Sequence, residues 1–293
     1  MNNLPVIATG INGLVGSRFA DLFSSKYQIT PLDLNHPHHP VDITNYKQVE
    51  NTISQSQGKV VIHLAAFTNV DAAWEQRGNK NGLAYQVNVI GTENILKACK
   101  ATHKHLIHIS TAYVFDGANE SLYTEEDSPH PIEWYGQTKW EAEQLVMNSD
   151  ISWSILRIDQ PFRPDEFEKK DVVHKIIERL KVDNLPPQFA NQFFGPTFID
   201  DFAKLLNFFI TTKTQGLFHA TSGEKWTPYD FAKLLKDTLN LPGSIIKGDL
   251  NDYLKTLNRP YQKNTALDCS KLSQTIDFSI ESIEDAVKKI VVD

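Results

Sequence analysis

Three glycines at intervals of three residues, in the segment Gly-Ile-Asn-Gly-Leu-Val-Gly at positions 10–16, constrain the fold of this chain more than any other feature. The apolar segment Leu4–Thr9 before them predicts a buried strand, and Leu14–Ser24 predicts a helix. A strand, a glycine turn and a helix in this order open a doubly wound sheet, and the turn can bring backbone N–H groups onto a dinucleotide pyrophosphate. The predicted cofactor-binding residues of the turn are Gly10, Asn12, Gly13, Leu14 and Gly16.

Strands and helices are predicted to alternate through about residue 158, which indicates an α/β fold with a Rossmann-like, doubly wound parallel sheet. We predict a dinucleotide-binding domain over residues 1–158 and a smaller, interleaved C-terminal substrate lobe over residues 159–293, with about 197–221 returning to the first domain. The other predicted strands are Gln28–Asp33, Val60–Ala66, His105–Ser110, Ile151–Ile158 and Gly216–Thr221, and the other predicted helices are Leu83–Thr102, Tyr135–Asn148, Thr197–Thr211 and Thr227–Leu239.

Composition excludes several classes of function. A net charge of −7 leaves no basic surplus to replace phosphate counterions, which argues against a nucleic-acid partner. No apolar run is long enough to span a membrane, and the N-terminal residues lack the basic segment of a signal peptide. The only cysteines, Cys99 and Cys269, show no metal-ligand spacing and are expected to be reduced and buried. We therefore expect a cytoplasmic protein without a metal site.

Asp33 ends the second predicted strand, 23 residues after Gly10. A carboxylate at about this spacing accepts hydrogen bonds from the adenosine ribose hydroxyls and repels a 2′-phosphate. No Arg or Lys occurs in the glycine turn, so NAD(H) is favoured over NADP(H), although a protonated His36 would weaken this preference. Asp42 and Ile43 either flank the adenine or begin a surface helix that Asp42 caps.

Tyr135 and Lys139 are four residues apart, which places a phenol and an ammonium on one face of the predicted helix. A free tyrosine has a pKa of about 10, and a nearby cation lowers this pKa by stabilising the phenolate. Thr111 ends a predicted strand, and its hydroxyl can hydrogen-bond a substrate oxygen. The combination predicts reduction of a ketone, in which a nicotinamide supplies the hydride, Tyr135 supplies the proton, and Lys139 tunes Tyr135 and binds the nicotinamide ribose.

These motifs resemble those of the extended short-chain dehydrogenase/reductases and, within them, the dTDP-4-dehydrorhamnose reductase family. The resemblance covers most of the chain, and its most specific segment is Thr-Ala-Tyr-Val-Phe-Asp-Gly at positions 111–117. The family implies reduction of a dTDP-linked 4-keto-6-deoxy sugar. The other segments that carry the resemblance are Val61–Asp71, Tyr85–Asn88, Tyr123–Asp127, Tyr135–Lys139, Gln192–Thr197 and Arg259–Asp268.

The resemblance also implies site residues. It identifies Thr111, Tyr135 and Lys139 as the catalytic set. Along the dinucleotide it places Ala65, Ala66, Thr68, Asn88, Tyr135 and Lys139, and near the substrate it places Thr111, Ala112, Tyr113, Gln192, Thr197 and Arg259. Two positions depart from the family pattern, because Ala112 stands where an acidic residue is usual and Gln160 stands where a tryptophan is frequent. Both positions would face the sugar, so they bear on which sugar is bound.

Two other functions are compatible with the same motifs. One is a nucleotide-sugar epimerase or dehydratase, in which the cofactor is recycled rather than consumed. The other is a non-catalytic regulatory subunit, because the regulatory β subunit of methionine adenosyltransferase resembles the same family. The intact threonine, tyrosine and lysine weigh against a pure scaffold. We expect a nucleotide-sugar substrate and, as for many soluble enzymes, a homodimer.

Overall fold

The computed structural model describes residues 3–292, which contain a parallel sheet of six strands in the order β2-β1-β3-β4-β5-β9. The strand order reverses between β1 and β3, so the carboxyl ends of these two strands form a topological switch point. This arrangement confirms the predicted Rossmann-like α/β fold. The strands are β1 (Leu4–Thr9), β2 (Tyr27–Leu32), β3 (Val60–His63), β4 (His105–Thr111), β5 (Trp153–Ile158) and β9 (Gly216–His219).

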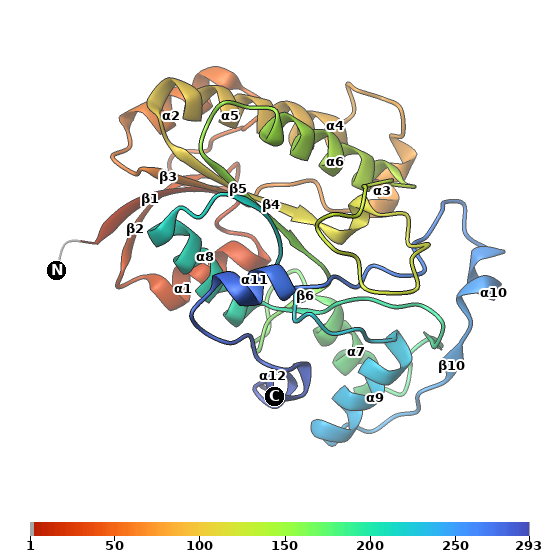
Figure 1. Ribbon diagram of the computed structural model, residues 1–293. Helices are drawn as coiled ribbons and strands as arrows, with labels where there is room; N and C mark the ends of the chain where they lie inside the picture. The colour runs from red at the N-terminus through yellow and green to blue at the C-terminus, as the bar shows by residue number, and fades with distance from the viewer. Residues whose placement is uncertain (1–2, 293) are drawn as a thin grey trace.

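Helices cover both faces of the sheet (Figure 1). Side chains alternate between these faces along β1, where Ile7 belongs to the core under α2 and α5, and Val6 and Ala8 belong to the core with α1 and α8. The strands are consequently apolar on both sides, as expected of a covered parallel sheet. The helices are α2 (Tyr46–Gln55), α5 (Gly91–Thr102) and α6 (Trp134–Met147) on one face, and α1 (Leu14–Phe23) and α8 (Ile199–Thr212) on the other.

Several predicted elements differ in their bounds from the structure. The helix predicted over Thr197–Thr211, for example, begins at Ile199, because Thr197–Phe198 forms strand β8. The strand predicted over Val60–Ala66 ends at His63, because Ala65 turns its N–H to the Thr9 side chain instead of continuing the ladder. The helix predicted over Leu83–Thr102 has three parts: α4 (Leu83–Tyr85), the π-helical η1 (Gln86–Ile90) and α5. A hydrogen bond of a π-helical turn spans one more residue than a hydrogen bond of an α-helix. The spacing of apolar residues in the sequence does not reveal this extra residue.

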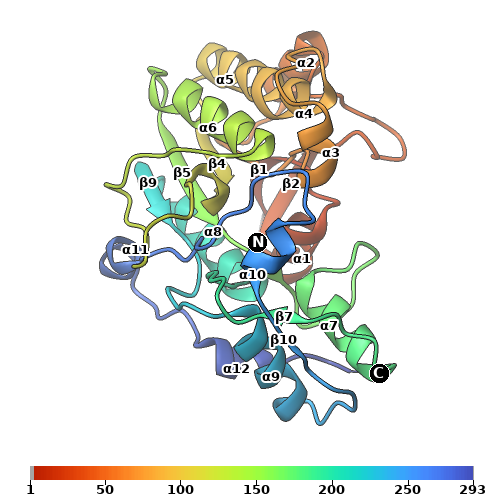
Figure 2. The same ribbon diagram turned by 90° about the vertical axis from the view of Figure 1, so that its right-hand side faces the viewer.

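The C-terminal half forms a second group of elements around its own apolar core (Figure 2). The chain returns to the central sheet through α8 and β9. The division into two domains at residue 158 stays a prediction. No helix within residues 3–292 is long and apolar enough to cross a membrane. The other elements are α3 (Val70–Glu75), η2 (Ala112–Val114), β6 (Pro161–Phe162), α7 (Val172–Lys181), β7 (Gln188–Phe189), β8 (Thr197–Phe198), α9 (Pro228–Thr238), β10 (Lys247–Gly248), α10 (Leu250–Leu254), α11 (Ser270–Thr275) and α12 (Ile283–Val287).

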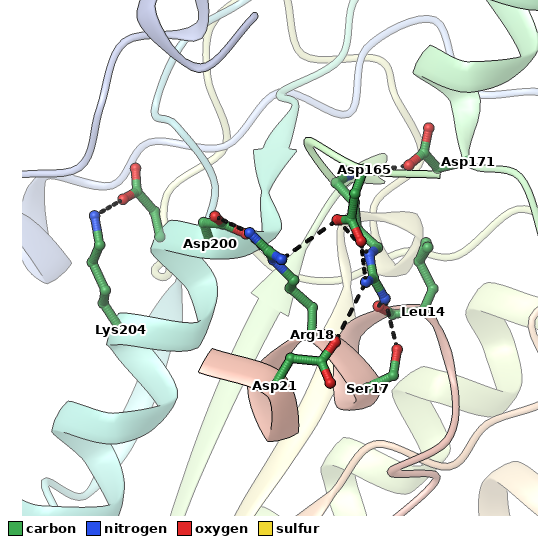
Figure 3. A network of polar contacts seen from close by, with 10 residues as sticks. Leu14, Ser17, Arg18, Asp21, Asp165, Asp171, Asp200 and Lys204 are labelled. Atoms are coloured by element: carbon green, nitrogen blue, oxygen red, sulfur yellow. Dashed lines mark hydrogen bonds and ion pairs between the residues drawn. The ribbon is translucent and has the colours of Figure 1, made fainter. Parts of the chain in front are cut away.

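Two arginines join α1 to the C-terminal half (Figure 3). Arg18 donates to both oxygens of Asp200 in α8, at 2.6 and 2.7 Å. Arg163, which follows β6, donates to both oxygens of Asp165, at 3.1 and 2.7 Å, and to Ser17 Oγ at 2.7 Å. Because Arg18 Nη1 lies 3.6 Å from Asp165 Oδ1, the two pairs form one network that positions α1 and the preceding glycine turn.

Candidate active site

The glycine turn packs tightly against the segment after β3. Gly10 has a φ of +62°, and a Cβ at this position would lie 2.7 Å from the Ala65 nitrogen, so a side chain does not fit. Gly13 is the N-cap of α1 and provides no side-chain hydrogen bond, which leaves the N-terminus of the helix open to an anion. The turn therefore fits the diphosphate of a dinucleotide. Asn12 is exposed, Leu14 begins α1 and Gly16 is buried.

Asp33 lies directly after β2, and its carboxylate holds the glycine turn. The two oxygens accept hydrogen bonds from the backbone nitrogens of Asn12, at 3.1 Å, and Asn35, at 2.9 Å. In the neighbouring loop, Nδ1 of His36 accepts from the backbone nitrogen of His39 at 3.0 Å.

Asp42 and Ile43 lie in a turn that precedes α2. Asp42 Oδ1 accepts from the backbone nitrogen and the hydroxyl of Thr44, at 2.9 and 2.8 Å. The cap of α2 is Asn45, so the predicted helix cap at Asp42 is wrong by three positions. The Ile43 side chain is buried and packs against Gly91 at the start of α5, so it belongs to the core.

A chain of buried hydrogen bonds fixes the segment that follows β3. The Thr92 hydroxyl donates to the Asn88 carbonyl at 2.7 Å, so its oxygen accepts from His63 Nε2 at 3.0 Å. His63 Nδ1 then accepts from the Thr9 hydroxyl at 2.8 Å, and the Thr9 oxygen accepts from Ala65 N at 3.0 Å. Burial lowers the pKa of His63 to about 3, which keeps this ring neutral. Each group in the series therefore donates to the next one, from Ala65 N to the Asn88 carbonyl.

Asn88 holds the same segment from the other side. Its Oδ1 accepts from Phe67 N at 2.8 Å, and its Nδ2 donates to Phe67 O at 3.2 Å and to Thr138 Oγ1 at 2.9 Å. Both amide hydrogens are therefore used within the protein. The side chain thus positions the backbone between Ala66 and Thr68, and a direct contact of Asn88 with the cofactor stays a prediction.

Lys169 reaches the site from the C-terminal half. Its Nζ donates to Thr68 Oγ1 at 3.0 Å, across 101 positions of the chain. Sequence analysis does not identify Lys169, because it lies in a segment of prolines and charges without a motif. The contact places a cation beside the predicted dinucleotide residues.

Thr111 and Tyr135 come together at the carboxyl end of β4. Thr111 is 6% exposed, and its oxygen accepts from Tyr113 N at 3.2 Å. Burial raises the pKa of Tyr135 well above its usual value, and the nearby Thr111 hydroxyl partly opposes this shift. The Tyr113 ring packs edge-on against Tyr135 with centroids 5.9 Å apart. A Cβ on Gly136 would overlap the Tyr113 carbonyl, so this close approach requires glycine.

Lys139 is 3% exposed and turns toward β4. Its Nζ donates to the Ile109 carbonyl at 2.8 Å and lies 3.5 Å from His108 Nε2. Burial lowers the pKa of Lys139 to about 8. The ammonium finds its acceptors on β4, and the predicted lowering of the Tyr135 pKa by Lys139 stays a prediction. The spacing of four residues sets a shared helix face but not a contact.

Glu133 is a site residue that sequence analysis misses. It is 2% exposed and caps α6, with its two oxygens accepting from Tyr135 N at 2.7 Å and Gly136 N at 2.6 Å. Burial raises the pKa of Glu133 to about 7, against the effect of these hydrogen bonds. The available signal was its place directly before the predicted helix, although glutamate is not among the preferred N-cap residues.

Three predicted substrate residues lie on the C-terminal half. Arg259 donates to Asp71 Oδ1 at 2.6 Å, and its guanidinium lies 4.9 Å from the centroid of the Tyr261 ring. Burial raises the pKa of Tyr261, and a hydrogen bond with Gln192 opposes this shift, so Gln192 and Arg259 meet at one phenol. The Thr197 hydroxyl donates to the Asp159 carbonyl at 2.7 Å and accepts from Asp159 N at 3.1 Å, so it is occupied within the protein.

Ala112 follows Thr111 in η2. It is fully buried in an apolar cluster with Val114 and Phe115, so its methyl group contributes to packing. Among residues 3–292, the His, Cys, Asp and Glu side chains form no group of three or more that could hold a metal ion.

Comparisons with known proteins agree with this architecture. A family model described as the RmlD substrate binding domain matches residues 4–293. The dTDP-4-dehydrorhamnose reductase of Aggregatibacter actinomycetemcomitans is 29% identical over 300 residues, covering 97% of each chain. The methionine adenosyltransferase 2 subunit beta of Rattus norvegicus is 29% identical over 283 residues, covering 92% of this chain and 83% of the relative. The crystal structure of a Bacillus anthracis dTDP-4-dehydrorhamnose reductase in complex with NADP superposes with a TM-score of 0.89 at 26% identity, over 99% of each chain.

Proposed function

Because this chain belongs to the family of the RmlD substrate binding domain, we propose that it reduces the 4-keto group of a nucleotide-linked deoxy sugar. The chain is an NAD(P)-dependent oxidoreductase. The observation that carries the proposal is the placement of Thr111 and Tyr135 at the carboxyl end of β4, on the same sheet edge as a glycine turn that fits a diphosphate. Tyr113 links the two, since its backbone nitrogen hydrogen-bonds Thr111 at 3.2 Å and its ring packs edge-on against Tyr135. The dTDP-4-dehydrorhamnose reductases among its relatives support a sugar nucleotide as the substrate.

We assign proton transfer to Tyr135. When bound, a nicotinamide supplies the hydride. The Thr111 oxygen accepts from Tyr113 N at 3.2 Å, which holds the side chain in place, and its hydroxyl would turn its hydrogen to the carbonyl oxygen of a bound substrate. The raised pKa keeps the Tyr135 phenol protonated at neutral pH, which is the state that a proton donor needs. Tyr135 then gives its proton to the same oxygen as negative charge develops there.

The remaining predicted residues are proposed to hold the cofactor. The backbone of Gly10–Gly16 would bind the diphosphate, and the segment Ala65–Thr68 would line the dinucleotide, held in place by Asn88. Lys139, with a pKa of about 8, is mostly protonated at pH 7 and would bind the nicotinamide ribose. These roles are supported by the positions of the residues along one edge of the sheet.

We propose that NADH is preferred over NADPH. The buried Asp33 carboxylate repels a 2′-phosphate, and the glycine turn offers no Arg or Lys to bind it. The relative from Bacillus anthracis was crystallised with NADP, so the preference needs direct measurement. Initial rates with the two cofactors over a range of concentrations give the ratio of kcat/KM values, and a more than tenfold preference for NADPH would contradict the assignment of Asp33.

The reductase proposal is tested by following the absorbance of NADH with dTDP-linked 4-keto-6-deoxy sugars. We expect one NADH consumed for each sugar reduced. An epimerase or dehydratase would change the sugar without net loss of NADH. A regulatory subunit would turn over no sugar and would co-purify with a stoichiometric partner.

We also propose a homodimer in the cytoplasm. Cys99 and Cys269 are buried free thiols, which agrees with a reducing compartment. Light scattering of the purified chain tests the dimer, and the mass of a single chain at micromolar concentration would exclude it.

A further inference from the structure

Asp159 occupies a place in the sheet that neither the predicted motifs nor the proposed mechanism uses. It directly follows β5, whose last residue, Ile158, pairs in register with Thr111 at the end of β4. The backbone of Asp159 therefore leaves the sheet beside the backbone of Ala112. Neighbouring strands are about 4.8 Å apart, so Asp159 lies one strand spacing from the residues that would bind the substrate carbonyl.

One oxygen of this carboxyl group is held firmly. Asp159 Oδ2 accepts from Gly195 N at 3.1 Å and from Thr265 Oγ1 at 2.6 Å. The backbone on both sides of the Asp159 side chain is tied to the Thr197 hydroxyl, and the next residue, Gln160, has a φ of +37°. A non-glycine residue in this region is strained, and such strain persists where the surroundings fix the backbone.

The other oxygen is free. Asp159 Oδ1 is buried and has no hydrogen-bond partner within residues 3–292. Burial raises the pKa of Asp159 to about 7, and the groups that oppose this shift are Thr265 and two backbone N–H groups, not a cation. A buried acceptor without a partner is unfavourable, so a site that maintains one is suited to a ligand that donates a hydrogen bond.

The free oxygen shares its surroundings with the proposed reaction centre. The Asp159 charge adds to burial in raising the pKa of Tyr135, and it does the same for Tyr113 and Tyr261. Gln262, the residue after Tyr261, is 1% exposed, and neither atom of its amide group has a partner in the described chain. The segment that follows Tyr261 thus also contains buried polar atoms without a partner.

We propose that Asp159 Oδ1 accepts a hydrogen bond from the sugar hydroxyl next to the reacting carbonyl, which in a 4-keto sugar is the hydroxyl on C3. The inference rests on the proposed function, in which Thr111 and Tyr135 engage the oxygen on C4. A group one strand away is placed to meet the substituent on the adjacent ring carbon. Asp159 is thus a specificity residue that selects sugars with a hydroxyl at C3.

The test compares the wild type with Asp159→Asn at pH 8, where the wild-type carboxyl is ionised. The amide oxygen of the variant can keep the bonds from Gly195 and Thr265, while its NH2 group replaces the free acceptor by a donor. We expect kcat/KM for the 3-hydroxy substrate to fall at least tenfold, mainly through KM, and kcat/KM for the 3-deoxy analogue to change less than twofold. The Kd for NADH should stay unchanged, and the Tm at pH 8 should not fall, because the neutral amide removes the cost of a buried ionised carboxyl.

A matched control is Asp171→Asn, which alters a second buried carboxyl whose oxygens are occupied by Arg163 N and His174 N. This control should lower the Tm without changing the ratio of kcat/KM for the two sugars. Equal losses with both sugars for Asp159→Asn, or no loss, would overturn the inference and leave the reductase proposal standing. If the wild type reduces no keto sugar, the proposed function fails instead. Calorimetric binding of the nucleotide sugars then decides about Asp159, and equal Kd values for wild type and variant would reject it.

Discussion

We call the carboxyl ends of β1 and β3 the glycine-turn edge, and the carboxyl ends of β4 and β5 the β4–β5 edge. The two edges differ in whether their buried polar groups find hydrogen-bond partners within the protein. At the glycine-turn edge, Thr9, His63 and Asn88 are linked into hydrogen bonds with fixed directions. At the β4–β5 edge, Asp159 Oδ1 has no partner within residues 3–292.

This difference separates two kinds of recognition. The glycine-turn edge is complete without a ligand, so it offers a rigid backbone surface whose shape selects a diphosphate. The β4–β5 edge gains hydrogen bonds only when a ligand supplies donors and acceptors, so the identity of the sugar is decided there. Variants at the two edges should consequently fail in different ways.

The largest expected effect is that of Tyr135→Phe at the β4–β5 edge. Removing the proton donor should lower kcat by about 10²–10⁴-fold, because general acid catalysis contributes this much. Titration of the variant with NADH should give the wild-type Kd. Tyr113→Phe, which alters the neighbouring phenol, is the control and should cost less than tenfold. A fully active Tyr135→Phe would remove the proposed mechanism.

Gly10→Ala should disable the glycine-turn edge through the backbone. The substitution combines about 1–2 kcal/mol of left-handed strain with about 1–3 kcal/mol of overpacking against Ala65. Urea unfolding should therefore show a loss of about 2–5 kcal/mol, with loss of NADH binding. Gly78→Ala is the matched control, since Gly78 has a φ of +76° and nothing within 4 Å of its Cβ position. Equal losses in both variants would show that the contact with Ala65 does not matter.

The two edges should respond to acid in opposite directions. Burial lowers the pKa of His63 to about 3 in the folded chain. As the pH falls below about 6.5, the unfolded chain therefore binds a proton at His63 before the folded chain does, and the contribution of neutral His63 to stability is lost. Burial raises the pKa of Asp159 to about 7 in the folded chain. The folded chain therefore holds this proton more firmly than the unfolded chain, and the resulting stabilisation is present near pH 4 and is lost as the pH rises toward 7.

Urea unfolding from pH 7 to 4 of the variants His63→Gln and Asp159→Asn measures these slopes. Each group changes the free energy of unfolding by up to about 1.4 kcal/mol per pH unit. Relative to the wild type, His63→Gln should lose less stability on acidification and Asp159→Asn should lose more. Parallel pH curves for the two variants would contradict the opposite signs.

The smallest expected effect is that of Lys169→Ala, which removes the cation beside Thr68. Because the Lys169 contact is exposed, stability should change by less than about 1 kcal/mol. The Kd for NADH should rise a few-fold at low salt and approach the wild-type value at high salt, as screening predicts. Lys170→Ala, in which the removed ammonium is paired with Glu178, is the control and should leave the Kd unchanged.

The glycine-turn edge was largely predictable from the sequence, and the β4–β5 edge only in part. Gly10 and Asp33 both shape the glycine turn, and the motif of glycine spacing followed by an acidic residue identifies both of them. Thr111 and Tyr135 were found by motif, but the direction of the Lys139 side chain depends on acceptors 30 and 31 positions earlier. Asp159 and Glu133 escaped notice because burial, not spacing, makes them unusual. The partners of Asp159 lie 36 and 106 positions away in segments without periodicity.

The most direct test of the central claim uses NADH that carries deuterium on the transferred position of the nicotinamide C4. Incubation with a dTDP-linked 4-keto-6-deoxy sugar should give a 4-hydroxy product with one deuterium on C4 of the sugar, in equal amount to the NADH oxidised. Mass spectrometry and proton NMR of the product measure both quantities. A sugar that is unchanged, or a product without deuterium on C4, would contradict reduction at the site of Thr111 and Tyr135.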